Sequence, residues 1–266
     1  MKTFLGELTA LVVAGWVMLI LGSAAPVCAV PADSSYECDV APSAATPAWE
    51  GGSPFGDEKM ASAIKCMSVK DGQLVKPVGT PEYTGMYVAV VPLLGVSYTV
   101  EMRFRITQVD ATKKYTGILT LLVSRKGSAY HSLTAGQGYD RNWSQGYFGS
   151  TLCLDNEWSA MVKDADITRG EWFTARLVVE DNIGSLRTRT YLNGKLMQEV
   201  VTSEKSRRQE CLSLRSGGEQ TAFAVDYIRW KNGAVPIDVP LDQALSEGEK
   251  AKQAEAEIIK KMEALF

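Results

Sequence analysis

Three charged side chains alternate along one short segment of the chain and could bind a polar ligand. Glu101, Arg103 and Arg105 share one parity of residues 98–106, and the residues of the other parity are apolar. A period of two predicts a half-buried β-strand whose charged residues lie on one face. Planar carboxylate and guanidinium groups can satisfy the hydroxyl groups of a sugar, so this face is a candidate carbohydrate-binding surface.

A glycine-rich stretch, residues 136–149, adds aromatic side chains to the candidate site. It contains Trp143 and Tyr147 among polar residues, and aromatic rings can pack against the apolar C–H groups of a sugar. An ordinary long connection, with Trp143 covering the core, explains the same stretch equally well. The candidate ligand-binding residues are Glu101, Arg103, Arg105, His131, Trp143 and Tyr147.

The candidate His131 is the only histidine of the chain. A single histidine excludes zinc sites built from several histidines and leaves at most one Ser-His-Asp triad. In a strand we expect it as a rim or hydrogen-bonded residue rather than as a catalyst. The net charge of −3 shows no basic surplus of the kind that nucleic-acid binding requires.

The elements that must position these residues are mostly short strands. Residues 172–180 alternate between apolar and polar, and residues 186–192 and 195–201 flank Asn193-Gly194. That dipeptide is typical of a type I′ hairpin turn, because both central residues of such a turn need a positive φ. Roughly a dozen such strands predict an all-β fold, a two-sheet antiparallel sandwich.

Four strand motifs, in this order along the chain, resemble the secreted bacterial LamG-like members of the concanavalin A-like lectin and glucanase superfamily. They are YTVEMRFRI at 98–106, GEWFTARLVV at 170–179, YLNGK at 191–195 and VDYIRW at 225–230. The resemblance implies a jelly-roll sandwich with a sugar-facing role. It says less about activity, because one fold hosts many functions.

The resemblance also implies a metal site. Laminarinase-type relatives often bind a structural calcium ion through the aspartate of the last strand, and Asp226 matches that position. Calcium prefers six or more hard oxygen ligands, so the implied cofactor is Ca²⁺. The alternative is that backbone amides satisfy the Asp226 carboxylate.

The motifs of the related enzymes are incomplete here. A glycosidase needs two carboxylates roughly 5 to 10 Å apart, and the Glu-x-Asp-x-x-Glu pattern of laminarinase-type enzymes is absent from the sequence. Residues 99–103 resemble only part of the Arg-x-Glu-x-Arg strand of alginate lyases. We therefore expect a non-catalytic carbohydrate-binding or surface-interaction module. The alternatives are a polysaccharide-degrading hydrolase or lyase with a site around Glu101, Arg103 and His131, and a structural protein of the cell envelope.

The N-terminus indicates export. An apolar run from Leu8 to Leu21, followed by Val27-Cys28-Ala29, fits a signal peptide cleaved after Ala29. We therefore expect a secreted, periplasmic or cell-envelope protein, which would contact a membrane only if this segment stays uncleaved. Export permits up to two disulfides, with Cys38–Cys66 and Cys153–Cys211 favoured by sequence neighbourhood and buried thiols as the alternative.

The C-terminal composition changes to Ala, Glu and Lys after Pro240. Residues 246–249 form a capping box, and Ala251, Ile258 and Met262 recur at helical spacing. This helix either packs on its own sandwich or binds a protein partner. We expect four segments in all: a signal peptide at 1–29, an extended segment at 30–59, the sandwich at 60–235, and a linker with a helical tail at 236–266.

Overall fold

The structure of the chain is a computed structural model. It describes residues 33–51, 66–79, 83–93, 97–108, 119–124, 130–137, 146–154, 157–165, 167–182, 184–202, 209–217 and 221–263. The expected signal peptide at 1–29 lies outside these residues, as does Trp143. Between residues 130 and 165, Leu133 is the one residue whose side chain is described.

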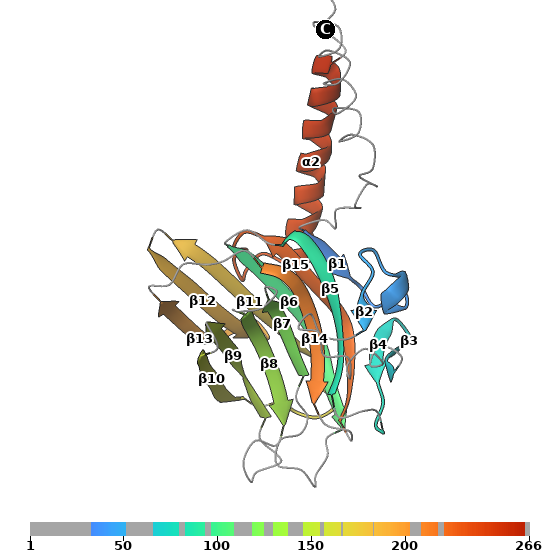
Figure 1. Cartoon of the computed structure of the whole chain (residues 1–266), viewed down its shortest axis with the longest axis vertical. Helices are drawn as coiled ribbons and strands as arrows, with labels where there is room; N and C mark the ends of the chain where they lie inside the picture. Colours follow the sequence, from blue (N-terminus) through green and yellow to red (C-terminus); the bar gives the residue numbers. More distant parts are fainter. Residues whose placement is uncertain are drawn as a thin grey trace, which may run out of the picture.

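The strands form two antiparallel sheets (Figure 1). Sheet A has the order β13-β12-β11-β6-β15-β4-β3, and β1 also pairs with β15. Its strands are β1 (Ser34–Tyr36), β3 (Ser68–Lys70), β4 (Gln73–Lys76), β6 (Tyr98–Gln108), β11 (Phe173–Asn182), β12 (Ser185–Leu192), β13 (Lys195–Thr202) and β15 (Ala222–Asn232).

Sheet B has the order β10-β9-β8-β7-β14-β5-β2. Its strands are β2 (Glu50–Gly51), β5 (Tyr83–Leu93), β7 (Leu119–Ser124), β8 (Tyr130–Gln137), β9 (Gly146–Leu154), β10 (Glu157–Ala165) and β14 (Gln209–Gly217). A short 3₁₀ helix, η1 (Pro42–Ala44), lies between β1 and β2, and the helix α2 (Leu241–Glu263) follows β15. The two-sheet all-β sandwich with a C-terminal helix is confirmed.

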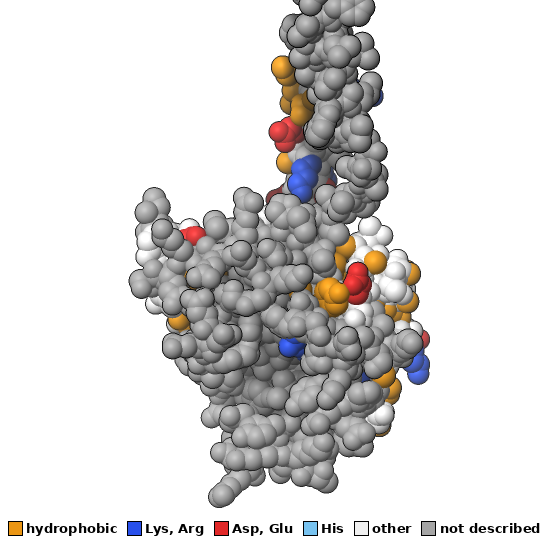
Figure 2. Space-filling view, viewed as in Figure 1, with side chains coloured by type: hydrophobic (Ala, Val, Ile, Leu, Met, Phe, Trp, Pro, Cys, Tyr) orange, Lys and Arg blue, Asp and Glu red, His pale blue; other side chains and the backbone are white. Residues whose placement is uncertain are grey.

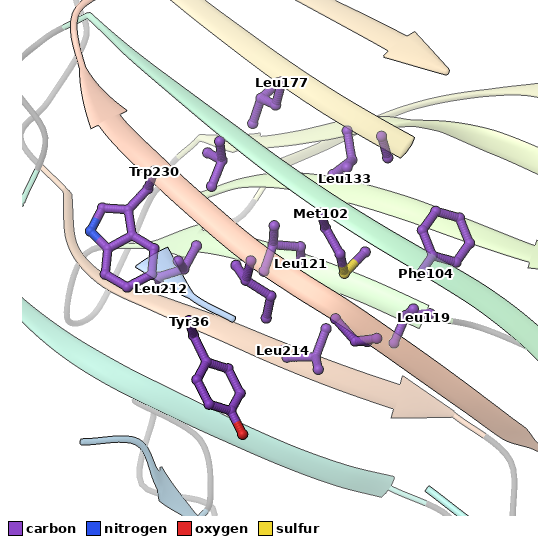
Figure 3. Packing of buried hydrophobic residues seen from close by; sticks show 14 of the residues in the cluster. Tyr36, Met102, Phe104, Leu119, Leu121, Leu133, Leu177, Leu212, Leu214 and Trp230 are labelled. Atoms are coloured by element: carbon purple, nitrogen blue, oxygen red, sulfur yellow. The ribbon is translucent and has the colours of Figure 1, made fainter. Parts of the chain in front are cut away.

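The core lies between the two sheets. Sheet A contributes Met102, Phe104 and Trp230, and sheet B contributes Leu121 and Leu214, all at most 1% exposed (Figure 3). Alternation produces this division, because successive side chains of a strand point to opposite faces. The apolar parity predicted for residues 98–106 is therefore the buried one, and its charged parity lies on the outer face of sheet A.

The predicted hairpin turn after β12 is confirmed. Asn193 has φ 50° and Gly194 has φ 79°, and Leu192 pairs with Lys195 across this two-residue turn. Positive φ at both central residues is the signature of a type I′ turn. The turn sets the register that places β13 at the edge of sheet A.

The sandwich begins earlier in the chain than residue 60. Strands β1 and β2 lie in the segment expected to be merely extended, and they join sheets A and B. Trp49 anchors this segment, being 1% exposed, with its ring 5.7 Å from the Tyr36 ring and 6.2 Å from the Trp230 ring. The burial of Trp49 between aromatic rings therefore holds this N-terminal segment on the sandwich. Its composition alone indicated only an extended loop.

Two strands differ from expectation in sheet B. The sequence did not predict β14, which pairs with both β5 and β7. Residues 86–91 predict a strand that ends before Pro92, but β5 continues to Leu93. Among the described strands, β2 pairs with β5 only at Met86 and Tyr87. Pro92 therefore lies on an edge, where its missing N–H is tolerated.

Helix α2 begins at Leu241, five residues before the predicted capping box. Leu241 and Ala244 are 1% and 8% exposed and pack with Val235, so tertiary contacts extend the helix toward the sandwich. Beyond its first two turns, α2 projects away from the sheets (Figure 1). None of the helices in the described stretches is long and apolar enough to span a membrane.

No disulfide is formed at Cys38, Cys66 or Cys211, so the expected Cys38–Cys66 pair is absent from the structure. Cys38 is fully buried in the core, and its Sγ donates a weak hydrogen bond to the Tyr36 carbonyl at 4.0 Å. Burial raises the pKa of the Cys38 thiol to about 12. The side chain of Cys153 lies outside the description.

Candidate functional site on the outer face of sheet A

The outer face of sheet A collects polar side chains from three neighbouring strands. Antiparallel register places Arg176 of β11 and Arg229 of β15 on either side of Glu101. The next row along the strands holds Thr174, Arg103 and Tyr227 from the same three strands. Residues of one row lie about 5 Å apart, so these side chains meet across the strands.

One end of this face carries a buried ion pair. The Arg176 guanidinium lies 2.6 Å from the Glu101 carboxylate, and the two side chains are 5% and 6% exposed. The Tyr227 hydroxyl donates a hydrogen bond to the other Glu101 oxygen at 3.0 Å. Burial, together with the neighbouring Glu101 carboxylate, raises the pKa of Tyr227 to about 12. Glu101 is therefore a structural acceptor at the centre of a closed network.

The linker between β15 and α2 covers this end. Arg176 Nη1 donates hydrogen bonds to the carbonyls of Pro236 and Val239, each at 3.0 Å. Thr99 Oγ1 donates to the Gly233 carbonyl at 3.0 Å and accepts from the Val235 N–H at 2.8 Å. We call this end, centred on Glu101, Arg176 and Thr99, the closed end.

The other end of the face remains open. Arg103 Nη1 donates to Asp226 Oδ2 at 2.7 Å, and the two side chains are 42% and 30% exposed. The guanidinium carbons of Arg103 and Arg105 lie 5.2 Å and 4.7 Å from the centre of the Trp172 ring, which is half-buried. Arg105 also donates to Gln73 Oε1 at 2.9 Å. We call the group Trp172, Arg103, Arg105, Asp226 and Gln73 the open end.

The open end has the composition of a saccharide site. The indole ring supplies an apolar plane, and two guanidinium groups, a carboxylate and an amide supply planar hydrogen-bonding groups. Cation–π contacts hold both guanidinium groups over the indole ring. These donors and acceptors are therefore pre-organised, which reduces the entropic cost of binding.

The predicted ligand residues do not form one site. Arg103 and Arg105 lie at the open end and Glu101 at the closed end. His131 and Tyr147 lie on β8 and β9 of sheet B, and Trp143 is outside the described residues. The two sheets pack face to face, so β8 and β9 of sheet B lie across the core from the outer face of sheet A. His131 and Tyr147 therefore cannot join a site on that face.

Trp172, Tyr227 and Arg176 are site residues that are not among the candidates from sequence. In the sequence, Trp172 belongs to a fold motif. The alternation of residues 172–176 was the available signal, because it places Trp172, Thr174 and Arg176 on the polar parity. What the sequence lacked was the pairing of Phe173 with Phe104, which aligns β11 beside β6.

The structure places Asp226, the expected calcium ligand, beside an arginine, and the calcium site stays a prediction. Asp226 lies where the register of β15 against β6 shifts, between Val225 and Tyr227, and its carboxylate accepts from the Arg103 guanidinium. No group of three or more His, Cys, Asp or Glu residues suited to a metal ion occurs within the described part of the chain.

A cavity of about 360 Å³ lies between β1, β15 and the base of α2. Its charges are paired with one another: Arg229 binds Glu37 at 2.9 Å, and Lys252 binds Asp33 at 3.1 Å. Burial alone would raise the pKa of Asp33, but hydrogen bonds from the Asn232 N–H and Lys252 bring it below its usual value of 3.8. The cavity therefore joins the helix base to the sandwich, and the open end is the better ligand site.

Comparison with solved structures confirms the concanavalin A-like jelly-roll fold. An endo-1,3-β-glucanase from Streptomyces sioyaensis matches with TM-score 0.56 and 12% identity, over 79% of this chain and 98% of the glucanase. The Bacillus licheniformis β-glucanase matches with TM-score 0.50 and 9% identity, over 75% of this chain and 98% of that one. The Emp46p carbohydrate recognition domain, in its metal-free form, matches with TM-score 0.50 and 11% identity, over 77% and 96%.

The similarity is confined to the fold. The chain spans 44% of the botulinum neurotoxin type G receptor-binding domain, which it matches with TM-score 0.46 and 9% identity over 68% of its own length. Comparison with family models gives no match, and comparison with curated protein sequences gives none.

Proposed function

We propose that this protein is an exported, non-catalytic carbohydrate-binding module that binds its ligand at the open end of sheet A. The observation that carries the proposal is the half-buried Trp172 ring with Arg103 and Arg105 held over it. The fold supports it in a general sense, because the similar structures include a carbohydrate recognition domain and two glucanases.

The carboxylates of this face favour binding over hydrolysis. A glycosidase acid must hold a proton that it can donate to the leaving group. Glu101 accepts from Arg176 and Tyr227, and Asp226 accepts from Arg103. Both carboxylates are therefore engaged by arginine side chains of the same face, and neither is directed at a bound ligand.

Affinity electrophoresis through gels containing plant, algal and bacterial polysaccharides tests the proposal. We expect retardation by at least one polysaccharide, and a loss of about tenfold or more in affinity for Trp172→Ala, since an aromatic ring buries a large apolar area. The matched control is Leu196→Ala, which removes an apolar side chain, 48% exposed, from β13 of the same sheet. Binding that survives Trp172→Ala would place the ligand elsewhere, and no binding to any polysaccharide would refute the function.

A second candidate function, self-association, is favoured by the exposed part of α2. The helical face buried at Leu241 and Ala244 continues as Ala251, Ile258 and Met262. Ile258 and Met262 are 58% and 56% exposed, and hydrophobic side chains are visible on the projecting helix in Figure 2.

We propose a second copy of this chain as the partner, because the apolar stripe of one α2 can pack against the same stripe of another. A measurement of mass in solution should show a dimer that Ile258→Lys with Met262→Lys converts to a monomer. The control Gln253→Lys, on the exposed polar face, should leave the dimer intact. A wild-type protein that stays monomeric up to about 100 μM, a weak-affinity concentration range, would rule this function out.

A further inference from the structure

Nearly every cation on the outer face of sheet A has a carboxylate partner. Six such pairs connect side chains of β6, β11, β12 and β15 with each other or with the adjoining segments. They are Arg103–Asp226, Arg176–Glu101, Arg187–Glu199, Arg189–Glu180, Arg229–Glu37 and Lys231–Asp33. The face is therefore close to electrically neutral over most of its area.

Arg105 is the exception among the described cations of these four strands. Its Nη2 donates to the amide oxygen of Gln73, which is neutral and leaves the guanidinium charge uncompensated. Its Nε is buried and has no hydrogen-bond partner among the described residues. The donor capacity and the positive charge of Arg105 are thus only partly used within the protein.

A second cation lies in the turn that is hydrogen-bonded to β6. Arg169 is exposed in the turn before Trp172, and no ion pair of Arg169 occurs in the described residues. The Gly170 N–H donates to the Ile106 carbonyl at 2.8 Å, which fixes this turn next to the end of β6. The one acid of the turn, Glu171, is exposed and pairs with neither arginine. Two arginines against one acid leave the Trp172 side of the open end positive.

This local charge contrasts with that of the whole chain. The net charge of −3 repels polyanions at long range. An anion would therefore be attracted here by the local arrangement alone. Arginine donors form charge-assisted hydrogen bonds with carboxylate and sulfate oxygens, stronger than those with neutral hydroxyls.

We infer that the open end binds an acidic saccharide, whose carboxylate or sulfate group pairs with Arg105 while a sugar ring packs on Trp172. The inference rests on the carbohydrate-binding function proposed above and specifies its substrate class. Arg105 supplies the charge selection, and Trp172 supplies affinity that is independent of charge. The exposed Arg169 adds attraction for a longer acidic chain.

The test uses polymers that differ only in charge: polygalacturonate and its methyl ester, and dextran sulfate and dextran. We expect at least one acidic polymer to bind about tenfold or more tightly than its neutral counterpart, the size of effect that one charge-assisted hydrogen bond produces. Arg105→Gln should remove this preference and leave the weaker binding to the neutral polymer unchanged. Trp172→Ala should weaken the binding of both.

Arg187→Gln is the matched control, because Arg187 lies on the same face, 43% exposed and paired with Glu199. It should keep the full preference for the acidic polymer. Thermal unfolding of each variant shows whether it remains folded. Arg105→Lys is a second variant, which keeps the charge and should retain part of the preference.

The outcomes separate the two proposals. Equal binding of charged and neutral polymers, lost with Trp172→Ala, would overturn the acidic specificity and keep the carbohydrate-binding function. An acidic preference that survives Arg105→Gln would overturn the role of Arg105. Binding to none of the four polymers would overturn the acidic specificity, and the wider polysaccharide panel then decides the carbohydrate-binding function separately.

Discussion

The two ends of the outer face of sheet A contain the same kind of ion pair in opposite surroundings. Glu101 and Arg176 at the closed end are 2.6 Å apart, and Asp226 and Arg103 at the open end are 2.7 Å apart. Their side chains are 5–6% exposed in the first pair and 30–42% exposed in the second. The two pairs therefore differ in interaction energy although their distances are nearly the same. Water screens the charges of the open pair much more than those of the closed pair.

The difference in surroundings comes from the linker that covers one end. The backbone carbonyls of Pro236 and Val239 accept hydrogen bonds from Arg176. A buried guanidinium is tolerated only when its donors and charge are satisfied. The closed end thus stabilises the base of α2, and the open end keeps its polar groups accessible to a ligand.

The largest effect is expected when the closed pair is broken. Arg176→Met leaves the Glu101 carboxylate buried without its cation, which should lower the free energy of unfolding by about 3–5 kcal/mol. Urea denaturation followed by tryptophan fluorescence measures it. The double variant Glu101→Gln with Arg176→Met should recover part of the loss. A loss below about 1 kcal/mol would show that the closed end is solvated like the open one.

A smaller effect is expected from the hydroxyl that binds the linker. Thr99→Val leaves the Val235 N–H without its acceptor, which should cost about 1–3 kcal/mol. Thr174→Val, a half-buried position of the neighbouring strand outside the linker contacts, is the control and should cost less. Hydrogen exchange of the Val235 amide should rise in the Thr99 variant, and unchanged exchange would contradict the assigned bond.

Asp33, in the cavity at the base of α2, gives the stability of this region a pH dependence. Its pKa is lowered in the folded state, so its stabilising contribution is present above the unfolded value of 3.8 and is lost as the pH falls through the lower folded value. Asp33→Asn should therefore lower the free energy of unfolding by about 1 kcal/mol at pH 7. The difference from wild type should shrink below pH 4, a range measurable by urea denaturation. A difference that is constant with pH would exclude the ionised carboxylate as its cause.

The smallest effect is expected at the open end. Asp226→Asn and Arg103→Gln should each change the free energy of unfolding by less than about 1 kcal/mol, because both side chains are partly exposed. A double-mutant cycle should give a coupling of about 0.2–1 kcal/mol. A coupling as large as that of Glu101 with Arg176 would remove the distinction between the two ends.

The sequence predicted the strands well where hydrophobic alternation was continuous. Residues 98–106 show a strict period of two, and residues 172–180 keep it except at Val178. Asn193-Gly194 favours a type I′ turn, so local information determined β6, β11 and the hairpin that follows. Strand β14 was missed because no clear alternation or turn signal marked residues 209–217. The early start of α2 was missed because contacts between Leu241 and Val235, distant from the local capping signal, extend the helix.

The site was less predictable than the strands because its chemistry depends on pairing between distant residues. Glu101 and Arg105 lie on the same face of β6. No local sequence signal shows that Glu101 is buried and that Arg105 is only partly buried. Their difference arises from Arg176, 75 residues away in sequence, and from a linker that crosses only one end of the strand. A sequence pattern can predict which face of a strand carries a side chain. Whether another segment covers that face depends on tertiary contacts, which the local pattern does not contain.

The Asp33 carboxylate, which binds Lys231 and Lys252 and accepts from the Asn232 N–H, brings both ends of the described chain to one corner. Along β6, the six residue steps from Thr99 to Arg105 separate this corner from Trp172 by about 20 Å. Helix α2, with 23 residues, is about 34 Å long and acts as a spacer beyond it. A sensor surface or fusion partner attached after α2 would therefore leave Trp172 facing free solution.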